Sequence, residues 1–226
     1  MNVRIVSRYL PLALLLAIPA ALRAADESPH AVWEKAIAAF EEKDKTSPPP
    51  KHANLFVGSS SIRLWKVEEA FPEYEVINRG FGGSEIADST HFADRIILPY
   101  EPDVIVFYAG DNDMAKGKSP QQILEDYKAF VAKVHGALPQ TKIVYISIKP
   151  SVARWALYSA MEQANGLIKE ETETSDLLEF VDIAPAMIGE DGKPKADLLL
   201  EDGLHLNEEG YKRWNDAVRP HLKPKA

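Results

Sequence analysis

The chain has 226 residues, the size of one domain with short extensions, and its 46% hydrophobic and 27% charged residues are typical of a globular protein. It has no cysteine, which excludes disulfides, thiolate metal ligands and a cysteine nucleophile. Its net charge of −8 argues against nucleic acid and against an anionic membrane surface as partners, because both require a basic face.

The first 25 residues have the pattern of a secretory signal peptide. Arg4 and Arg8 open the segment, an apolar run follows from Leu10 to Ile18, and Ala24 and Ala25 are small residues suited to cleavage. The apolar run is too short to cross a bilayer comfortably, although an uncleaved anchor is the alternative. We therefore expect an exported protein, periplasmic or secreted, with no stable membrane insertion after cleavage.

A helix is expected next in the chain. Apolar residues at helical spacing over Ser28–Lys45 predict an amphipathic helix, and Pro48–Pro50 end it. We interpret residues 26–53 as this helix with a proline-rich linker and residues 54–226 as the main domain. The helix would pack either on that domain or on a partner, and the oligomeric state stays open.

The main domain alternates between apolar strands and helices. Five short apolar runs predict strands: Asn54–Val57, Tyr74–Ile77, Val104–Ala109, Lys142–Ile148 and Leu178–Ile183. Helical patterns cover 119–137, 154–173 and 208–222, and the first begins at Ser119 with proline next and glutamine three residues on. Strands that are apolar on both faces predict an α/β fold with a five-stranded parallel sheet covered on both sides.

The loop after the first strand holds a candidate nucleophile. In such sheets ligands bind beyond the carboxyl ends of the strands, so these loops are where chemistry is expected. Gly58 permits a sharp turn that would place Ser60 at a helix N-terminus, where free N–H groups favour negative charge. The alternative is a serine helix cap, and Ser59 and Ser61 are rivals to Ser60.

The next two loops offer hydrogen-bond donors. Asn78–Ser84 contains three glycines, and the exposed N–H of Gly83 would suit a reacting oxygen, with a plain flexible turn as the alternative. In Gly110–Asp113 the amide of Asn112 would donate to an oxyanion, with ordinary turn chemistry as the alternative.

A late loop places an acid three residues before a histidine. One turn can direct the Asp202 carboxylate at Nδ1 of His205 and leave Nε2 free to take a hydroxyl proton, as a general base requires. A purely local contact between the two side chains is the alternative.

The order Ser60, Gly83, Asn112, Asp202, His205 on strand ends resembles the SGNH/GDSL hydrolase family of esterases and lipases, over residues 54–222. The resemblance implies a three-layer α/β/α sandwich like that of flavodoxin. It implies Ser60 as nucleophile, completed by Asp202 and His205 as a triad. It also implies an oxyanion hole made by the N–H groups of Ser60 and Gly83 and the Asn112 amide.

One position departs from the family pattern, because Ser59 stands where an aspartate usually precedes the nucleophile. The expected reaction is hydrolysis of carboxylic esters through an acyl-enzyme on Ser60, without metal or cofactor. The expected substrate is a small-molecule or glycan ester: an acyl ester of a carbohydrate, a glycan or a lipid-derived alcohol.

The expected cleft is open, because the loops are short and no lid is evident. Lys149, Arg154 and Trp155 follow the fourth strand and are candidates for one wall of the substrate pocket, with Trp65 for another. Helix–sheet packing is the favoured alternative for both tryptophans.

Other functions remain as alternatives. A hydrolase with a Gly-x-Ser-x-Gly elbow is disfavoured because Ile62 occupies the second glycine position. A metallophosphoesterase would need several carboxylates and histidines on different strand ends, and His205 is the only well-placed histidine. A catalytically inactive carbohydrate-binding module of the same fold, or an acyltransferase using the same triad, stays open.

Overall fold

The chain folds around a five-stranded, all-parallel sheet, as predicted. The structure is a computed structural model that describes residues 28–225, so the predicted signal peptide lies outside the described residues. The sheet order is β2-β1-β3-β4-β5. The strands are β1 (Asn54–Gly58), β2 (Val76–Gly80), β3 (Val104–Tyr108), β4 (Lys142–Ile146) and β5 (Leu178–Val181).

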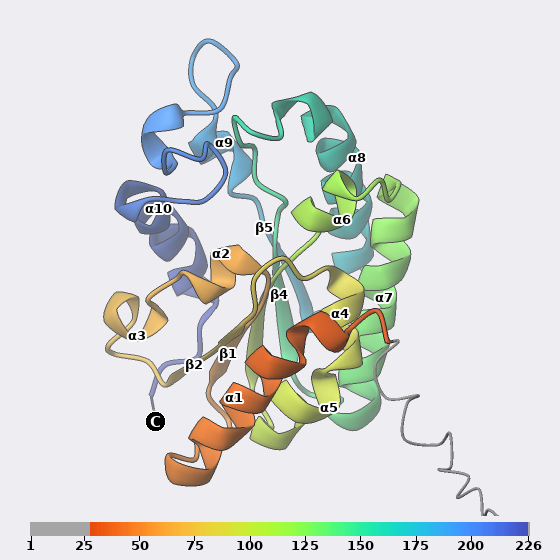
Figure 1. Ribbon diagram of the computed structural model, residues 1–226, viewed down its shortest axis with the longest axis vertical. Helices are drawn as coiled ribbons and strands as arrows, with labels where there is room; N and C mark the ends of the chain where they lie inside the picture. Colours follow the sequence, from red (N-terminus) through yellow and green to blue (C-terminus); the bar gives the residue numbers. More distant parts are fainter. Residues whose placement is uncertain (1–27, 226) are drawn as a thin grey trace, which may run out of the picture.

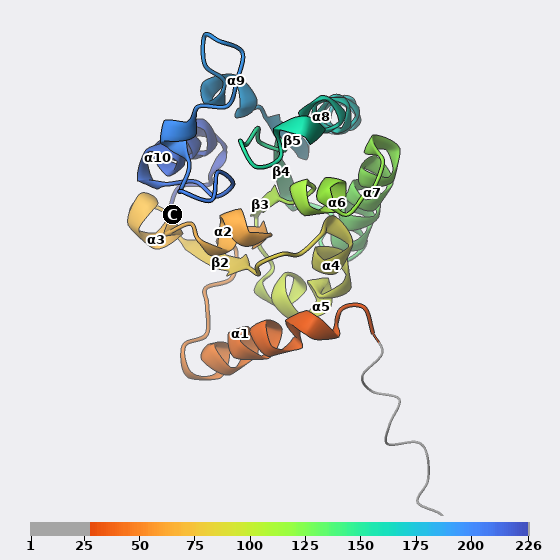
Figure 2. The same ribbon diagram turned by 45° about the horizontal axis from the view of Figure 1, so that its top comes forward.

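Helices cover both faces of the sheet and form a three-layer α/β/α arrangement (Figures 1 and 2). One core lies under α1 (Glu34–Thr46), α4 (Ile86–His91), α5 (Ala93–Ile96), α7 (Pro120–Ala137) and α8 (Tyr158–Thr172). The other lies under α2 (Ser60–Arg63), α3 (Val67–Ala70), α9 (Ala184–Met187) and α10 (Glu208–Val218). Leu55 and Val57 face the first core and Phe56 the second, which explains why the strand is apolar throughout.

The long helices match the predicted ranges in part, because α1 and α8 begin at Glu34 and Tyr158, later than the predicted starts at Ser28 and Arg154. At the start of α7, Ser119 and Gln122 form the predicted capping box, each side chain bonding the other's backbone N–H. The last helix ends at Val218, earlier than predicted, and a 3₁₀ turn over Arg219–His221 contains Pro220.

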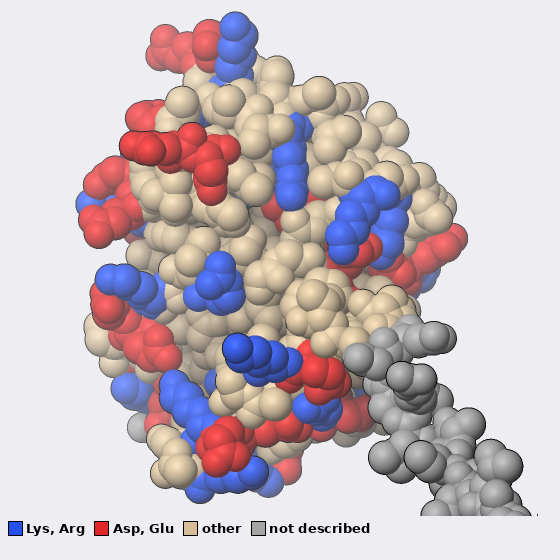
Figure 3. All heavy atoms as spheres, viewed as in Figure 1, with Lys and Arg blue, Asp and Glu red and all other residues tan. Residues whose placement is uncertain are grey.

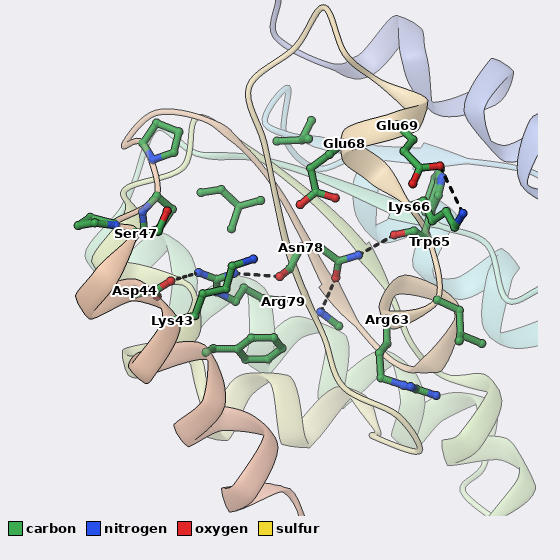
Figure 4. Close-up of a pocket in the computed structure, with 18 residues that line it drawn as sticks. Lys43, Asp44, Ser47, Arg63, Trp65, Lys66, Glu68, Glu69, Asn78 and Arg79 are labelled. Carbon is green, nitrogen blue, oxygen red and sulfur yellow. Dashed lines mark hydrogen bonds and ion pairs between the residues drawn. The ribbon is translucent and has the colours of Figure 1, made fainter.

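Strand β2 lies further along the chain than predicted, because polar residues are part of it. Asn78 pairs with Phe56 and Gly80 with Gly58 in the sheet register. The Asn78 side chain donates to the carbonyl oxygen of Trp65 at 2.9 Å, and Arg79 is 4% exposed (Figure 4). These polar side chains have partners inside the protein, so a strand boundary judged by apolar residues alone was misplaced.

The N-terminal helix α1 packs on its own domain. Ile37 is fully buried in the first core, and Arg79 donates to Asp44 of α1 at 2.5 Å (Figure 4). On the same helix, Glu34 and Glu41 both pair with Arg95 of α5. Of the two arrangements that the sequence left open, the structure has the helix on its own chain. None of the helices in residues 28–225 has both the length and the hydropathy of a membrane span.

Candidate active site

The carboxyl ends of β1, β2 and β3 lie side by side, which brings their loops together. Gly58 is in register with both Gly80 and Tyr108. Gly58 has φ +134°, and a Cβ there would lie 1.9 Å from the carbonyl oxygen of Tyr108. Only glycine fits this close approach, and the chain then turns directly into α2 at Ser60.

Ser60, His205 and Asp202 form a continuous hydrogen-bonded chain. His205 Nε2 lies 2.9 Å from Ser60 Oγ, and its Nδ1 lies 2.6 Å from Asp202 Oδ2. The other oxygen, Oδ1, accepts the backbone N–H groups of Leu204 and His205, both at 2.9 Å. The carboxylate is therefore held at both oxygens, and the imidazole is oriented with Nε2 towards the serine.

The hydrogen bond from the His205 side chain, helped by the two backbone N–H groups, lowers the pKa of Asp202 to about 2. The Asp202 side chain is 47% exposed and that of His205 is 23% exposed, so the pair lies at the edge of the site rather than deep within it. The carboxylate is ionised throughout the neutral range and can stabilise a protonated imidazole.

Of the three consecutive serines, Ser60 is the one that contacts the histidine. Ser59 and Ser61 are buried, and neither hydroxyl has a hydrogen-bond partner among the described residues. Ser59 occupies the N-cap position of α2 but its side chain makes no capping bond. The position where the family usually has aspartate thus contributes no side-chain hydrogen bond here.

Three possible hydrogen-bond donors lie at one cavity: the backbone N–H groups of Ser60 and Gly83 and the side-chain amide of Asn112. Ser60, Gly83, Asn112 and His205 all line a cavity of about 840 Å³. The N–H groups of Ser60 and Gly83 donate no hydrogen bond to any described residue. Gly83 has φ +78°, a left-handed conformation that glycine adopts without strain.

The Asn112 amide is held in one orientation. Its Nδ2 donates to the carbonyl oxygen of Ser84 at 3.0 Å, and its Oδ1 accepts from Arg154 Nη2 at 2.8 Å. Arg154 also pairs with Asp111 at 3.0 Å. Because the guanidinium can only donate, it fixes which end of the amide is oxygen, and the second N–H of Nδ2 stays available.

The predicted wall after β4 is only partly at the cavity. Arg154 lines it, as expected. Lys149, however, is 1% exposed, and its Nζ lies 3.7 Å from Asp111 Oδ2 beneath the site. Burial lowers the pKa of Lys149, and the nearby carboxylate opposes that shift. Lys149 therefore lies below the surface and does not line the cavity.

Trp65 and Trp155, the two tryptophans that the sequence suggested for the pocket walls, do not line this cavity. Trp155 stacks on Tyr158 with ring centroids 4.9 Å apart and lines a separate hollow. Trp65 is 3% exposed and packs edge-on against Phe56, so it belongs to the second core. Helix–sheet packing, the alternative given for both residues, describes Trp65, whereas Trp155 is 37% exposed and lies at the surface.

One wall of the cavity comes from the N-terminal segment, which the sequence did not connect with the site. The wall residues are Val32, Trp33, Lys35, Ala36 and Ala39. Trp33 Nε1 donates to the carbonyl oxygen of Gly82 at 2.9 Å, directly before Gly83. Val32 is one of the apolar residues at helical spacing that predict the amphipathic helix, yet it is 75% exposed. Helical spacing therefore gave no signal that this residue lines the cavity.

A family model described as GDSL-like lipase/acylhydrolase matches residues 63–213, more than half of the chain. The chain belongs to this family. The matched segment contains Gly83, Asn112, Asp202 and His205, and Ser60 lies just before it. A search of the curated proteins finds no match.

Solved structures of the same fold cover most of the chain. A protein from Streptococcus pneumonia has TM-score 0.76 and 23% identity, covering 84% of this chain and 92% of its own. A GDSL-like lipase from Bacteroides thetaiotaomicron has TM-score 0.68 and 18% identity, with 82% and 96% covered. An acetylxylan esterase from Geobacillus stearothermophilus has TM-score 0.62 and 14% identity, with 78% and 96% covered. At these identities the structures show the fold, and together with the family they support ester hydrolysis.

Proposed function

We propose that this protein is an exported serine esterase that hydrolyses carboxylic esters through an acyl-enzyme on Ser60. The observation that carries the proposal is the hydrogen-bonded chain from Ser60 Oγ through His205 to Asp202, at 2.9 Å and 2.6 Å. A serine hydroxyl is a weak nucleophile until a base takes its proton, and this chain supplies the base and the group that orients it.

The proposed reaction has two halves. Ser60 Oγ attacks the ester carbonyl while His205 Nε2 takes its proton, and His205 then protonates the departing alcohol. Water, activated by the same nitrogen, attacks the acyl-enzyme and releases the carboxylic acid. Asp202, with its low pKa, stays ionised and stabilises the imidazolium in both halves.

The oxyanion would be held by three donors: the N–H groups of Ser60 and Gly83 and the free N–H of the Asn112 amide. Support comes from their common cavity and from the absence of any internal acceptor for the two backbone groups within residues 28–225. Removing one such donor typically costs about 100- to 1000-fold in rate.

Export and substrate belong to the same proposal. The basic, apolar and small-residue pattern of the first 25 residues supports export. An exported esterase would meet acylated carbohydrates, cell-wall glycans or lipid-derived esters. The acetylxylan esterase among the similar structures was solved as a serine-to-alanine catalytic mutant, which supports both a sugar ester and a serine nucleophile.

The test is hydrolysis of p-nitrophenyl acetate, butyrate and octanoate by the full chain, expressed with its leader and purified from the exported fraction. We expect Ser60→Ala to lose activity by about 10⁴-fold or more and to lose labelling by a fluorophosphonate. Ser59→Ala and Ser61→Ala are matched controls, since they remove neighbouring hydroxyls that have no hydrogen-bond partner.

Activity that survives in Ser60→Ala but disappears in a control would move the nucleophile. A folded wild type that neither hydrolyses these esters nor takes the label would contradict the proposal and favour the binding-module alternative. N-terminal sequencing of the exported protein tests cleavage after Ala24 or Ala25.

A further inference from the structure

The cavity beside Ser60 is lined by several cations. Lys35, Arg63 and Arg154 are its charged lining residues, and within residues 28–225 no aspartate or glutamate lines it. This contrasts with the whole chain, which has 34 acidic and 26 basic residues. A cluster of one sign, opposite to the net charge, indicates a local electrostatic preference.

Two of these cations lack a carboxylate partner. Within residues 28–225, no acidic oxygen lies within 4.0 Å of Lys35 or Arg63. In Figure 4, Arg63 points away from Glu68 and Glu69, the acidic residues labelled near it. Both side chains are exposed, so their positive charge is available to a ligand.

The third cation is only partly neutralised. Arg154 pairs with Asp111 at 3.0 Å, but Lys149 also lies 3.7 Å from the same Asp111 oxygen. One carboxylate is therefore shared between two basic side chains under the cavity. The positive charge without a carboxylate partner is therefore that of Lys35 and Arg63, at the rim of the cavity.

The remaining lining is largely uncharged. Val32, Trp33, Ala36 and Ala39 form the wall on the N-terminal side, and Leu204 stands beside His205. In Figure 3 the middle of this face is mostly tan, with Lys and Arg side chains bordering it. The cavity thus offers an apolar surface with cations at its edge.

We propose that the natural substrate is an ester that carries an anionic group, a carboxylate or a phosphate, bound by Lys35 and Arg63 while its ester reaches Ser60. This inference rests on the proposed function. Arginine suits both anions because its guanidinium forms two parallel hydrogen bonds to either. A neutral ester would use the apolar wall but leave both charges without a partner.

The size of the preference follows from the exposure of the two cations. A solvent-exposed ion pair contributes modestly, so we expect each cation to raise kcat/KM for the anionic ester about twofold to fivefold. The preference should shrink as salt is added, because exposed charges are screened.

The test compares 4-acetoxybenzoate with its neutral methyl ester, using the full exported protein and following release of the phenol. A third substrate, 4-acetoxyphenyl phosphate, distinguishes phosphate from carboxylate. The measured quantity is the ratio of kcat/KM for the anionic ester to that for the neutral one. A ratio taken on one preparation is independent of the fraction of folded protein.

We expect Lys35→Gln/Arg63→Gln to lower this ratio about four- to 25-fold for at least one of the two anions, and the larger drop identifies the group. The matched control is Lys169→Gln/Arg213→Gln, which removes the same charges from α8 and α10, outside the cavity. The control ratio should equal that of the wild type.

A ratio that is unchanged in the double variant Lys35→Gln/Arg63→Gln for both anions overturns the inference. If Ser60→Ala still abolishes hydrolysis in that case, the proposed function stands although the substrate inference has failed. Equal loss in the variant and the control would reduce the effect to net charge and also overturn it. Hydrolysis that does not depend on Ser60 would overturn the proposed function and this inference together.

Discussion

At the scale of single residues, the orientation of Asn112 depends on a neighbour that sequence spacing does not reveal. An amide rotated by 180° would present oxygen where the reaction needs a donor. Arg154, 42 residues further along the chain, prevents this by donating to Oδ1 at 2.8 Å. We therefore regard Arg154 as a positioning residue for the proposed oxyanion hole as well as a cation at the cavity.

We expect Arg154→Met to lower kcat for a neutral ester about tenfold, less than the 100- to 1000-fold expected for Asn112→Ala. Methionine keeps much of the length and apolar stem but cannot donate. Steady-state kinetics of both variants and of the double variant test this. If Arg154 acts through Asn112, adding Arg154→Met to Asn112→Ala costs little more. Multiplicative losses would show an independent role.

At the scale of secondary-structure elements, α1 and the turn before it are part of the site rather than an appendage. Arg79 and Arg95 pair with acids along α1, which fixes the helix against β2 and α5. Its N-terminal end then places Trp33 within hydrogen-bonding distance of the loop that carries Gly83. The helix thereby supplies both a cavity wall and support for a proposed oxyanion donor.

We expect Trp33→Phe to reduce kcat about threefold to tenfold, in line with the loss of one hydrogen bond. Phenylalanine keeps an aromatic ring but removes the N–H that holds the Gly82 carbonyl at 2.9 Å. Kinetics on p-nitrophenyl butyrate measure the change. Trp155→Phe is the matched control, because Trp155 lies outside this cavity and should leave kcat unchanged. Equal effects in both variants would contradict the role of Trp33.

At the scale of the whole molecule, one buried acid links the elements around the site and makes stability depend on pH. Asp113 is fully buried, accepts the N–H of Ile86 at the start of α4, and pairs with Lys118 at 3.0 Å. Burial raises its pKa to about 6 from an ordinary 3.8, despite the opposing effect of Lys118.

The folded protein therefore binds this proton more tightly than the unfolded chain. Stability from this group is present in full below about pH 4 and is lost as the pH rises through about 6. We expect the free energy of unfolding of the wild type, relative to Asp113→Asn, to fall by up to about 3 kcal/mol between pH 4 and pH 7. Urea unfolding of both proteins at several pH values measures this. If the free energy of unfolding of the wild type rises with pH relative to that of Asp113→Asn, the raised pKa of Asp113 is contradicted.

The layered α/β fold and the strand ends where chemistry is expected could be predicted from the sequence alone. Apolar strands at regular intervals can only be buried on both faces, so they require a parallel sheet between helices. Topology then brings the loops after Gly58, Gly80 and Tyr108 together at one edge. The candidate residues on these loops were predictable for that reason.

Long-range packing sets which neighbours complete the candidate site. Lys149, Arg154 and Trp155 all follow β4 closely in sequence. Lys149 is nevertheless buried, and Trp155 lines a different hollow from the one that Arg154 lines. Trp33 and Lys35 reach the cavity because the N-terminal segment packs back on the domain, beside the loop that carries Gly83. The physical reason is that periodicity reports which face of an element is buried, whereas side-chain direction and long-range packing depend on contacts between elements.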